Sequence, residues 1–288
     1  MRWRGGPHSG NVEDRRGMRG RGVAIGGGGL LLIIILSLVF GVDPQQFLVQ
    51  GQGGAPGPGG AVQERELTPQ ERQQREFVEA VVGFTEAVWD EQFRRAGERY
   101  EKPRVVLFEQ AVDTRCGRAP SAVGPFYCPA DETVYLDPTF FDELQNKLGG
   151  SKGEFSQAYV IAHEVGHHVQ NLLGYSELVN SKRRTLPPSE FNKWSVRLEL
   201  QADYLAGVWA HHGQRKFNFI EPGDVRSAIT TANAIGDDRL QRRSRGFTSP
   251  ENYTHGTSEQ RMKWFTLGLE TGDLDRIGEL FELPYQQL

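Results

Sequence analysis

Residues 154–173 have the sequence Glu154-Phe-Ser-Gln-Ala-Tyr-Val-Ile-Ala-His163-Glu164-Val-Gly-His167-His168-Val-Gln-Asn-Leu-Leu173, which contains the pattern H-E-x-x-H. Apolar residues recur in it at steps of three and four, at Ala158, Ala162, Val165, Val169 and Leu172. Gly174 follows, where a glycine commonly ends a helix. We therefore expect one helix over residues 154–173.

On such a helix, His163 and His167 project from the same face one turn apart, so both can bind one metal ion. Two imidazoles suit zinc, at roughly 2.0–2.1 Å each. Glu164 lies beside them and is placed to take a proton from a metal-bound water. His168 points about 100° away from His167 and is not expected to be a ligand.

A catalytic zinc needs a third protein ligand and an open position for water. A second helix is predicted over residues 189–210, with Ser189 as its N-cap after two prolines. Glu199 and Asp203 are four apart on it and share a face. We predict that Glu199 is the third ligand and that Asp203 accepts a hydrogen bond from His163. A solvated acidic stripe is the alternative interpretation.

The small residues Ala202, Ala206 and Gly207 predict close packing of this second helix against the His163 helix.

These residues resemble the gluzincin pattern of thermolysin-like and integral-membrane metalloproteases. Over nearly its full length the chain resembles the bacterial putative neutral zinc metallopeptidase family. The motifs that carry this resemblance are Met-Arg-Trp-Arg-Gly at residues 1–5, Asn-Val-Glu-Asp-Arg-Arg at 11–16, His-Glu-Val-Gly-His-His-Val-Gln at 163–170, Glu-Leu-Gln-Ala-Asp at 199–203, Ala-Ile-Gly-Asp-Asp at 234–238 and His-Gly-Thr-Ser-Glu-Gln-Arg at 255–261.

The resemblance implies zinc-dependent hydrolysis of peptide bonds, with one zinc ion. It also implies that His255 stabilises the oxyanion of the reaction, with Arg261 nearby, although an exposed turn histidine is an equal alternative. Enzymes of this group align an extended substrate along an edge strand, and residues 124–136 are the candidate. An ordinary core hairpin there is equally compatible with the sequence.

Length and composition limit the other possibilities. A chain of 288 residues with 38% hydrophobic content can build one sizeable core. The net charge of −4 and a pI near 6.0 argue against a nucleic-acid partner.

The amino-terminal part predicts a membrane anchor. Residues 23–42 carry no charge and can cross a hydrocarbon core of about 30 Å as a helix. Arginines precede this stretch, at Arg2, Arg4, Arg15, Arg16, Arg19 and Arg21. By the positive-inside rule, residues 1–22 are then cytoplasmic. A cleaved signal peptide is the competing interpretation.

Residues 43–66 are rich in Gly, Pro and Gln and predict a flexible linker. Residues 67–288 would form the metallopeptidase domain, anchored in the inner membrane and facing the periplasm or the cell exterior.

Cys116 and Cys128 are the two cysteines of the chain. In an exported domain this pair predicts a disulfide, whereas in the cytosol two free thiols would be expected.

The rest of the chain predicts an α+β, mostly helical, zincin-like domain with a small antiparallel sheet. Helices are expected near residues 68–97, 138–148, 223–236 and from 257 onward, and strands at 104–108, 124–128 and 133–136. His211 and His212 are expected to cap their own helix before Gly213. Asp237 and Asp238 are expected to have a structural role in a loop.

The leading hypothesis is a membrane-anchored zinc endopeptidase acting on protein or peptide substrates, with Glu164 as general base. The alternative is a metal-stabilised binding module or envelope adaptor with little turnover. Zinc-dependent hydrolysis of a non-peptide amide is a third hypothesis.

Overall fold

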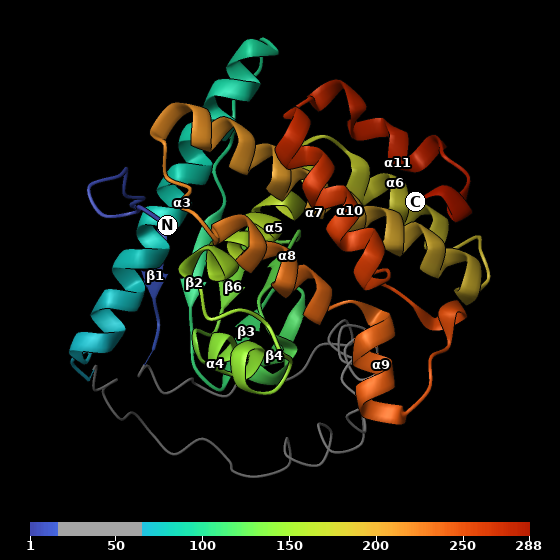
Figure 1. Cartoon of the computed structure of the whole chain (residues 1–288), viewed down its shortest axis with the longest axis horizontal. Coiled ribbons are helices and arrows are strands. Elements are labelled where there is room, and N and C mark those ends of the chain that lie inside the picture. Colours follow the sequence, from blue (N-terminus) through green and yellow to red (C-terminus); the bar gives the residue numbers. More distant parts are fainter. Residues whose placement is uncertain (17–64) are drawn as a thin grey trace.

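The computed structural model describes residues 1–16 and 65–288 (Figure 1). The strands are β1 (Val12–Asp14), β2 (Arg104–Leu107), β3 (Ala111–Thr114), β4 (Gly117–Pro120), β5 (Phe126–Cys128) and β6 (Thr133–Leu136). The α-helices are α3 (Pro69–Arg95), α4 (Thr139–Asn146), α5 (Glu154–Leu172), α6 (Tyr175–Arg183), α7 (Pro188–Phe217), α8 (Asp224–Ala234), α9 (Asp237–Arg245), α10 (Ser258–Thr271) and α11 (Glu279–Glu282). Short 3₁₀ helices cover Ser121–Val123, Pro250–Asn252, Leu274–Gly278 and Tyr285–Gln287. The predicted α+β, mostly helical class is confirmed.

The main sheet has four strands in the order β1-β2-β6-β5. It is mixed and not antiparallel as predicted, because β1 pairs with β2 and β2 pairs with β6 in parallel, while β5 pairs with β6 antiparallel. The physical reason is the connection after β2. The chain runs through the β3–β4 hairpin and β5 before it forms β6, so β6 starts from the same end of the sheet as β2.

Side chains of β2 alternate between two faces, as expected for a strand. Val105 and Leu107 join the large helical core, whereas Val106 joins a smaller cluster with Phe126 and Tyr135. Helices α3 and α5 therefore cover one face of the sheet, and the β3–β4 hairpin covers the other.

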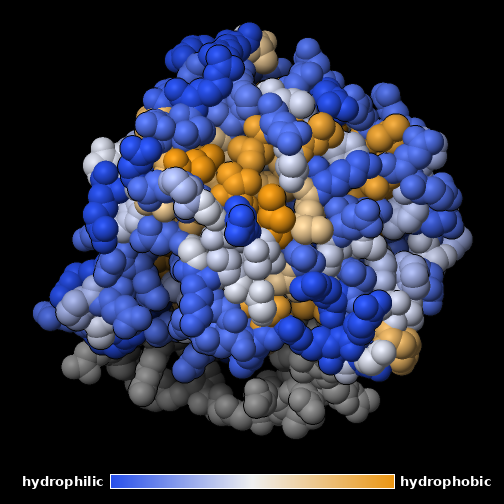
Figure 2. All heavy atoms as spheres, viewed as in Figure 1, coloured by the Kyte–Doolittle hydropathy of each residue, from blue (hydrophilic) through white to orange (hydrophobic). Residues whose placement is uncertain are grey.

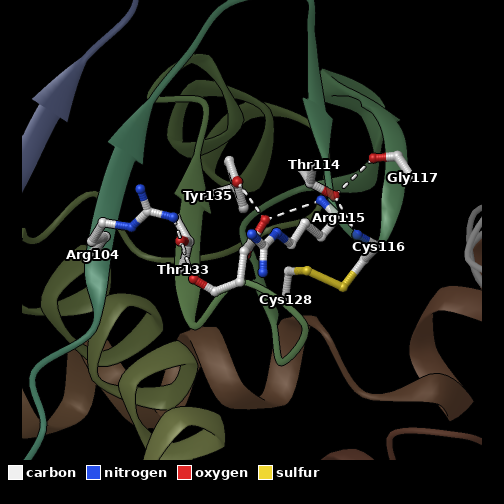
Figure 3. Close-up of a disulfide and its surroundings, with 9 residues drawn as sticks. Arg104, Thr114, Arg115, Cys116, Gly117, Cys128, Thr133 and Tyr135 are labelled. Atoms are coloured by element: carbon white, nitrogen blue, oxygen red, sulfur yellow. Dashed lines mark hydrogen bonds between the residues drawn. A yellow bond between two sulfur atoms is a disulfide. The ribbon is translucent and has the colours of Figure 1, made fainter. Parts of the chain in front are cut away.

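A disulfide joins Cys116, in the turn of this hairpin, to Cys128 at the end of β5 (Figure 3). The predicted disulfide is thus confirmed. Next to it, the carboxylate of Asp131 accepts hydrogen bonds from the Arg115 backbone N–H (3.0 Å) and the Tyr135 hydroxyl (2.9 Å). The hairpin is therefore fixed to the sheet both covalently and by hydrogen bonds.

Helix α7 is the central helix and packs against both α5 and α10. Gly166 on α5 makes the first contact close, because a Cβ there would lie 3.1 Å from the Ala202 carbonyl oxygen. Gly207 was expected to face α5 as well, but it faces α10. A Cβ at Gly207 would lie 2.2 Å from the Phe265 carbonyl oxygen, which no side chain could tolerate.

Two predicted helix ends are wrong. Helix α7 has Pro187, not Ser189, at its N-cap, and it continues through Gly213 to Phe217. His211 and His212 therefore do not end their own helix. They donate hydrogen bonds to carbonyls at the end of α10, those of Leu269 (2.9 Å) and Gly272 (2.8 Å).

The first sixteen residues belong to the same folded body as residues 65–288. The amino group of Met1 lies 3.2 Å from the Asp224 carboxylate of α8 and 3.3 Å from Glu221. Trp3 is buried and donates to Glu154, the first residue of α5 (3.0 Å). Asn11 donates to the Glu86 carboxylate of α3 (2.7 Å). The arginine-rich amino terminus is thus tied to the helices that carry the rest of the fold.

The two described residues that flank positions 17–64 contact the same residue of α3. Arg16 donates to the Glu71 carbonyl oxygen of α3 (2.8 Å), and Arg65 donates to the Glu71 carboxylate (2.8 Å). The predicted transmembrane stretch, residues 23–42, lies outside the described residues. Among the helices that are described, none is both long and apolar enough to span a bilayer.

Figure 2 shows a largely hydrophilic surface on this face of the molecule, with apolar residues gathered near its centre.

Strands β1 and β2 pair in parallel, so we expect residues 1–16 and 65–288 to lie on the same side of any membrane. This expectation differs from the predicted cytoplasmic segment 1–22 and periplasmic domain 67–288. We expect Gly10→Cys and Glu98→Cys, both at exposed positions, to react alike with a membrane-impermeant thiol reagent in intact cells. The native cysteines form a disulfide and add no background. Labelling of one variant and protection of the other would contradict the described packing.

We expect the double variant Cys116→Ala, Cys128→Ala to unfold more easily in denaturant, with a free energy of unfolding lower by up to about 3 kcal/mol. The reason is that the disulfide restricts the unfolded chain. Reduced wild-type protein is the control and should show the same loss. Equal stability of the oxidised wild type and the double variant would argue against a stabilising disulfide.

Candidate metal centre

Three predicted ligands meet between α5 and α7. One ligand atom from each of His163, His167 and Glu199 lies within 4.8 Å of the other two. The Glu199 carboxylate oxygens are 3.3 Å from Nε2 of His163 and 3.5 Å from Nε2 of His167. Zinc bonds of about 2.0–2.1 Å in a tetrahedron would separate neighbouring ligand atoms by about 3.3–3.4 Å. The donor set therefore fits zinc in its chemistry, and each histidine Nε2 lies close to this spacing from an oxygen of Glu199.

Asp203 holds the first histidine, as the sequence analysis expected. Nδ1 of His163 donates to Oδ1 of Asp203 (2.8 Å), so the other ring nitrogen, Nε2, faces Glu199 and is the atom that a metal would bind in place of a proton. Burial by itself lowers the pKa of His163, but the Asp203 carboxylate outweighs it and raises this pKa to about 10. The hydrogen bond from Nδ1 to Asp203 thus fixes the orientation of the His163 ring.

Asp203 is itself the centre of a buried cluster. Arg261 on α10 donates from Nε to Oδ2 (2.8 Å) and from Nη2 to Oδ1 (3.0 Å) of Asp203. The hydroxyl of Tyr159 donates to Oδ1 (2.5 Å). Burial alone would raise the pKa of Asp203, but Arg261 and then His163 outweigh burial and lower it to about 2. The carboxylate therefore stays charged and paired.

His167 has a different partner, which the sequence analysis missed. Its Nδ1 donates to the amide oxygen of Gln170, one helical turn later (2.8 Å). The spacing of three residues on one helix was the available signal. A glutamine at this spacing is common on helices, so the signal is unspecific.

Glu164 is 7% exposed and lies beside the ligands on α5. Burial raises the pKa of its carboxyl group, and the nearby His167 and His163 offset only part of this effect. A carboxylate with a raised pKa is a better acceptor for a proton from water than an ordinary one, and it can release that proton later.

His255 and Glu199 interact electrostatically, and each shifts the pKa of the other. Burial lowers the pKa of His255, but Glu199 and Asp237 outweigh it, so this pKa is raised. Burial raises the pKa of Glu199, but His167 and His255 outweigh it, so this pKa lies well below its usual range.

The loop that carries His255 is fixed by Asp237, the first residue of α9. Its Oδ2 accepts the backbone N–H groups of Thr254 (2.7 Å), His255 (2.7 Å) and Gly256 (3.0 Å). Its Oδ1 lies 3.3 Å from Nδ1 of His255. Asp238 accepts from the Ser258 backbone N–H (2.7 Å) at the start of α10. The expected structural role of Asp237 and Asp238 is present, although their helix was not predicted.

His168 faces away from the ligands, in accord with the sequence analysis. Its Nδ1 accepts a hydrogen bond from the Tyr127 hydroxyl of β5 (3.0 Å), and its Nε2 donates to the Glu101 carbonyl oxygen (2.6 Å). This fully buried histidine therefore connects the edge strand β5 to the helix that carries the ligands.

The sequence profile of the putative neutral zinc metallopeptidase family matches residues 1–279 of this chain. The chain is 44% identical over 285 residues to "Uncharacterized protein YpfJ" of Escherichia coli (strain K12), covering 95% of this chain and 96% of that protein. It is 45% identical over 183 residues to "Uncharacterized protein Rv2575" of Mycobacterium tuberculosis (strain ATCC 25618 / H37Rv), covering 60% and 61% of the two chains. No solved structure is significantly similar to this chain.

We expect Glu199→Ala to weaken zinc binding by about 100-fold or more, because it removes one of three converging ligands. Loss of an outer partner of a ligand typically costs 10–100-fold. The affinity is measured by competition with a chromophoric chelator. Glu190→Ala, an exposed carboxylate on the same helix, is the control and should bind zinc like wild type. Equal zinc affinity of the two variants would show that Glu199 is not a ligand.

Proposed function

Since this chain belongs to the putative neutral zinc metallopeptidase family, we propose that it is a zinc-dependent endopeptidase that hydrolyses peptide bonds in protein or peptide substrates. The observation that carries the proposal is the convergence of His163, His167 and Glu199, with Glu164 beside them. A site that only stabilised the fold would need no carboxylate of raised pKa at this position.

Zinc bound by these three side chains would supply a Lewis acid that polarises a carbonyl and lowers the pKa of a water molecule. Glu164 takes the proton of the attacking water on its carboxylate. It then gives that proton to the amine that leaves when the peptide C–N bond breaks. The raised pKa of Glu164 supports both steps, because a more basic carboxylate binds the proton long enough to transfer it.

His255 is proposed to donate a hydrogen bond to the oxyanion that forms when water attacks the carbonyl. Its raised pKa favours the protonated form that can donate. Asp237 fixes the backbone of this loop by three hydrogen bonds, so the imidazole is placed before the substrate arrives.

Strand β5 is proposed to bind the main chain of an extended substrate. It is the edge strand of the sheet on the side away from β1, and the Tyr127–His168 hydrogen bond ties it to α5. A peptide added to such an edge is held by main-chain hydrogen bonds, with little regard to its sequence.

We expect Glu164→Gln to bind zinc like wild type but to lose about 10²–10⁴-fold in the rate of cleavage of an unfolded protein, because the amide cannot accept the water proton. Glu143→Gln, at an exposed position of α4, is the matched control and should keep full activity.

Cleavage by Glu164→Gln at the control rate would disprove the proposed base. If zinc-loaded wild-type protein bound the unfolded protein without cleaving it, a metal-stabilised binding module would be the better description.

A further inference from the structure

Two fully buried glutamines form a chain of hydrogen bonds that begins at the second histidine ligand. Nδ1 of His167 donates to the amide oxygen of Gln170 (2.8 Å). The amide nitrogen of Gln170 donates to the Leu198 carbonyl oxygen (2.6 Å) and to the amide oxygen of Gln201 (2.9 Å). The amide nitrogen of Gln201 donates to the Ile277 carbonyl oxygen (2.8 Å).

The two backbone carbonyls fix the direction of this chain. A carbonyl oxygen can only accept, so the amide nitrogen of each glutamine must face it. The amide oxygen of Gln170 then faces His167, which must carry its proton on Nδ1. The lone pair of His167 is therefore on Nε2, the atom that lies 3.5 Å from the Glu199 carboxylate. The glutamines thus select the tautomer that can bind a metal.

The same side chain acts on a second ligand. Leu198, whose carbonyl accepts from Gln170, immediately precedes Glu199 in α7. Gln170 therefore contacts one ligand directly and the backbone next to another. It connects α5 and α7 at the level of the site, where the two helices must keep a fixed spacing for three ligands to converge.

Gln170 also differs in charge from the residue that holds the other histidine. Asp203 is a buried carboxylate whose charge Arg261 balances. A carboxylate at position 170 could still accept from His167. Its other oxygen, however, would face the Leu198 carbonyl oxygen and the Gln201 amide oxygen, and neither of these can donate to it. A neutral amide can accept from His167 and donate to both oxygens, which explains why this residue type suits the position.

We propose that Gln170 is a positioning residue of the metal centre, acting through His167 and the Leu198 backbone. Gln201 supports it by holding its amide and by connecting it to the 3₁₀ helix Leu274–Gly278. This role of Gln170 rests on the zinc site of the proposed function, but it does not depend on whether the protein hydrolyses peptide bonds.

The test is Gln170→Met, which keeps a side chain of similar size and removes all three hydrogen bonds of the amide. We expect the full-length variant to bind zinc 10–100-fold more weakly, as for other losses of an outer partner. We also expect the absorption bands of the cobalt-substituted protein to shift, because the imidazole of His167 is no longer held in one orientation.

Gln241→Met is the matched control, since Gln241 is also buried, lies on α9 and accepts from the Ser249 backbone N–H (2.8 Å). It should lower thermal stability without changing zinc affinity or the cobalt spectrum. Gln201→Met, which leaves the His167–Gln170 contact in place, should give an intermediate loss of affinity. It also carries the test if Gln170→Met does not fold. The proposal would be overturned if Gln170→Met and Gln201→Met had the same zinc affinity and the same cobalt spectrum as Gln241→Met.

Discussion

The carboxylate of Asp203 is fully buried between α5, α7 and α10, and its charge must be balanced where it lies. Arg261 from α10 supplies the balancing charge, while Tyr159 and His163 from α5 donate to the same group. One side chain of α7 thereby fixes the relative positions of three helices. The same contacts orient the first histidine, so packing and metal chemistry depend on one ion pair.

The two histidines are oriented by partners of different charge. His163 donates to the Asp203 carboxylate, and His167 donates to the neutral Gln170 amide. A carboxylate partner strengthens His163 as a donor to a metal, because it stabilises positive charge on the imidazole. The amide partner of His167 fixes direction without adding charge. Both imidazoles are therefore held in place, while negative charge is limited close to Glu164 and Glu199, whose pKa values shift in opposite directions.

Much of the site could be predicted because its signals are local. A spacing of four on a helix places His163 beside His167 and Glu199 beside Asp203, whatever the rest of the fold does. The starts of the helices at Thr68 and Thr257 could also be predicted from nearby residues, since each threonine forms a capping box with the residue three positions later.

The features that were predicted wrongly or not at all depend on tertiary contacts, which a local sequence pattern does not reveal. The parallel pairing of β1 with β2 joins residues about ninety positions apart, so its partner cannot be read from either strand. The end of α7 was misplaced because Gly213 fits against the Phe219 ring, and the glycine therefore serves packing and not helix termination. The role of Gln170 was not predicted, because the sequence does not show which donors and acceptors a buried amide will contact in the folded protein.

The position of β1 in the sheet has a consequence for the order of folding. This strand precedes its partner β2 by about ninety residues in the chain, and the α8 carboxylate that meets Met1 comes later still. Docking of β1 is therefore a late event in folding, and it is opposed by the entropy lost when a long loop closes. Until then the outer edge of β2 presents unpaired backbone groups, which can template association with another chain. A fragment that began near Arg65 would lack residues 1–16, and the edge of β2 would stay unpaired. Such a fragment would be less soluble than the chain that contains β1.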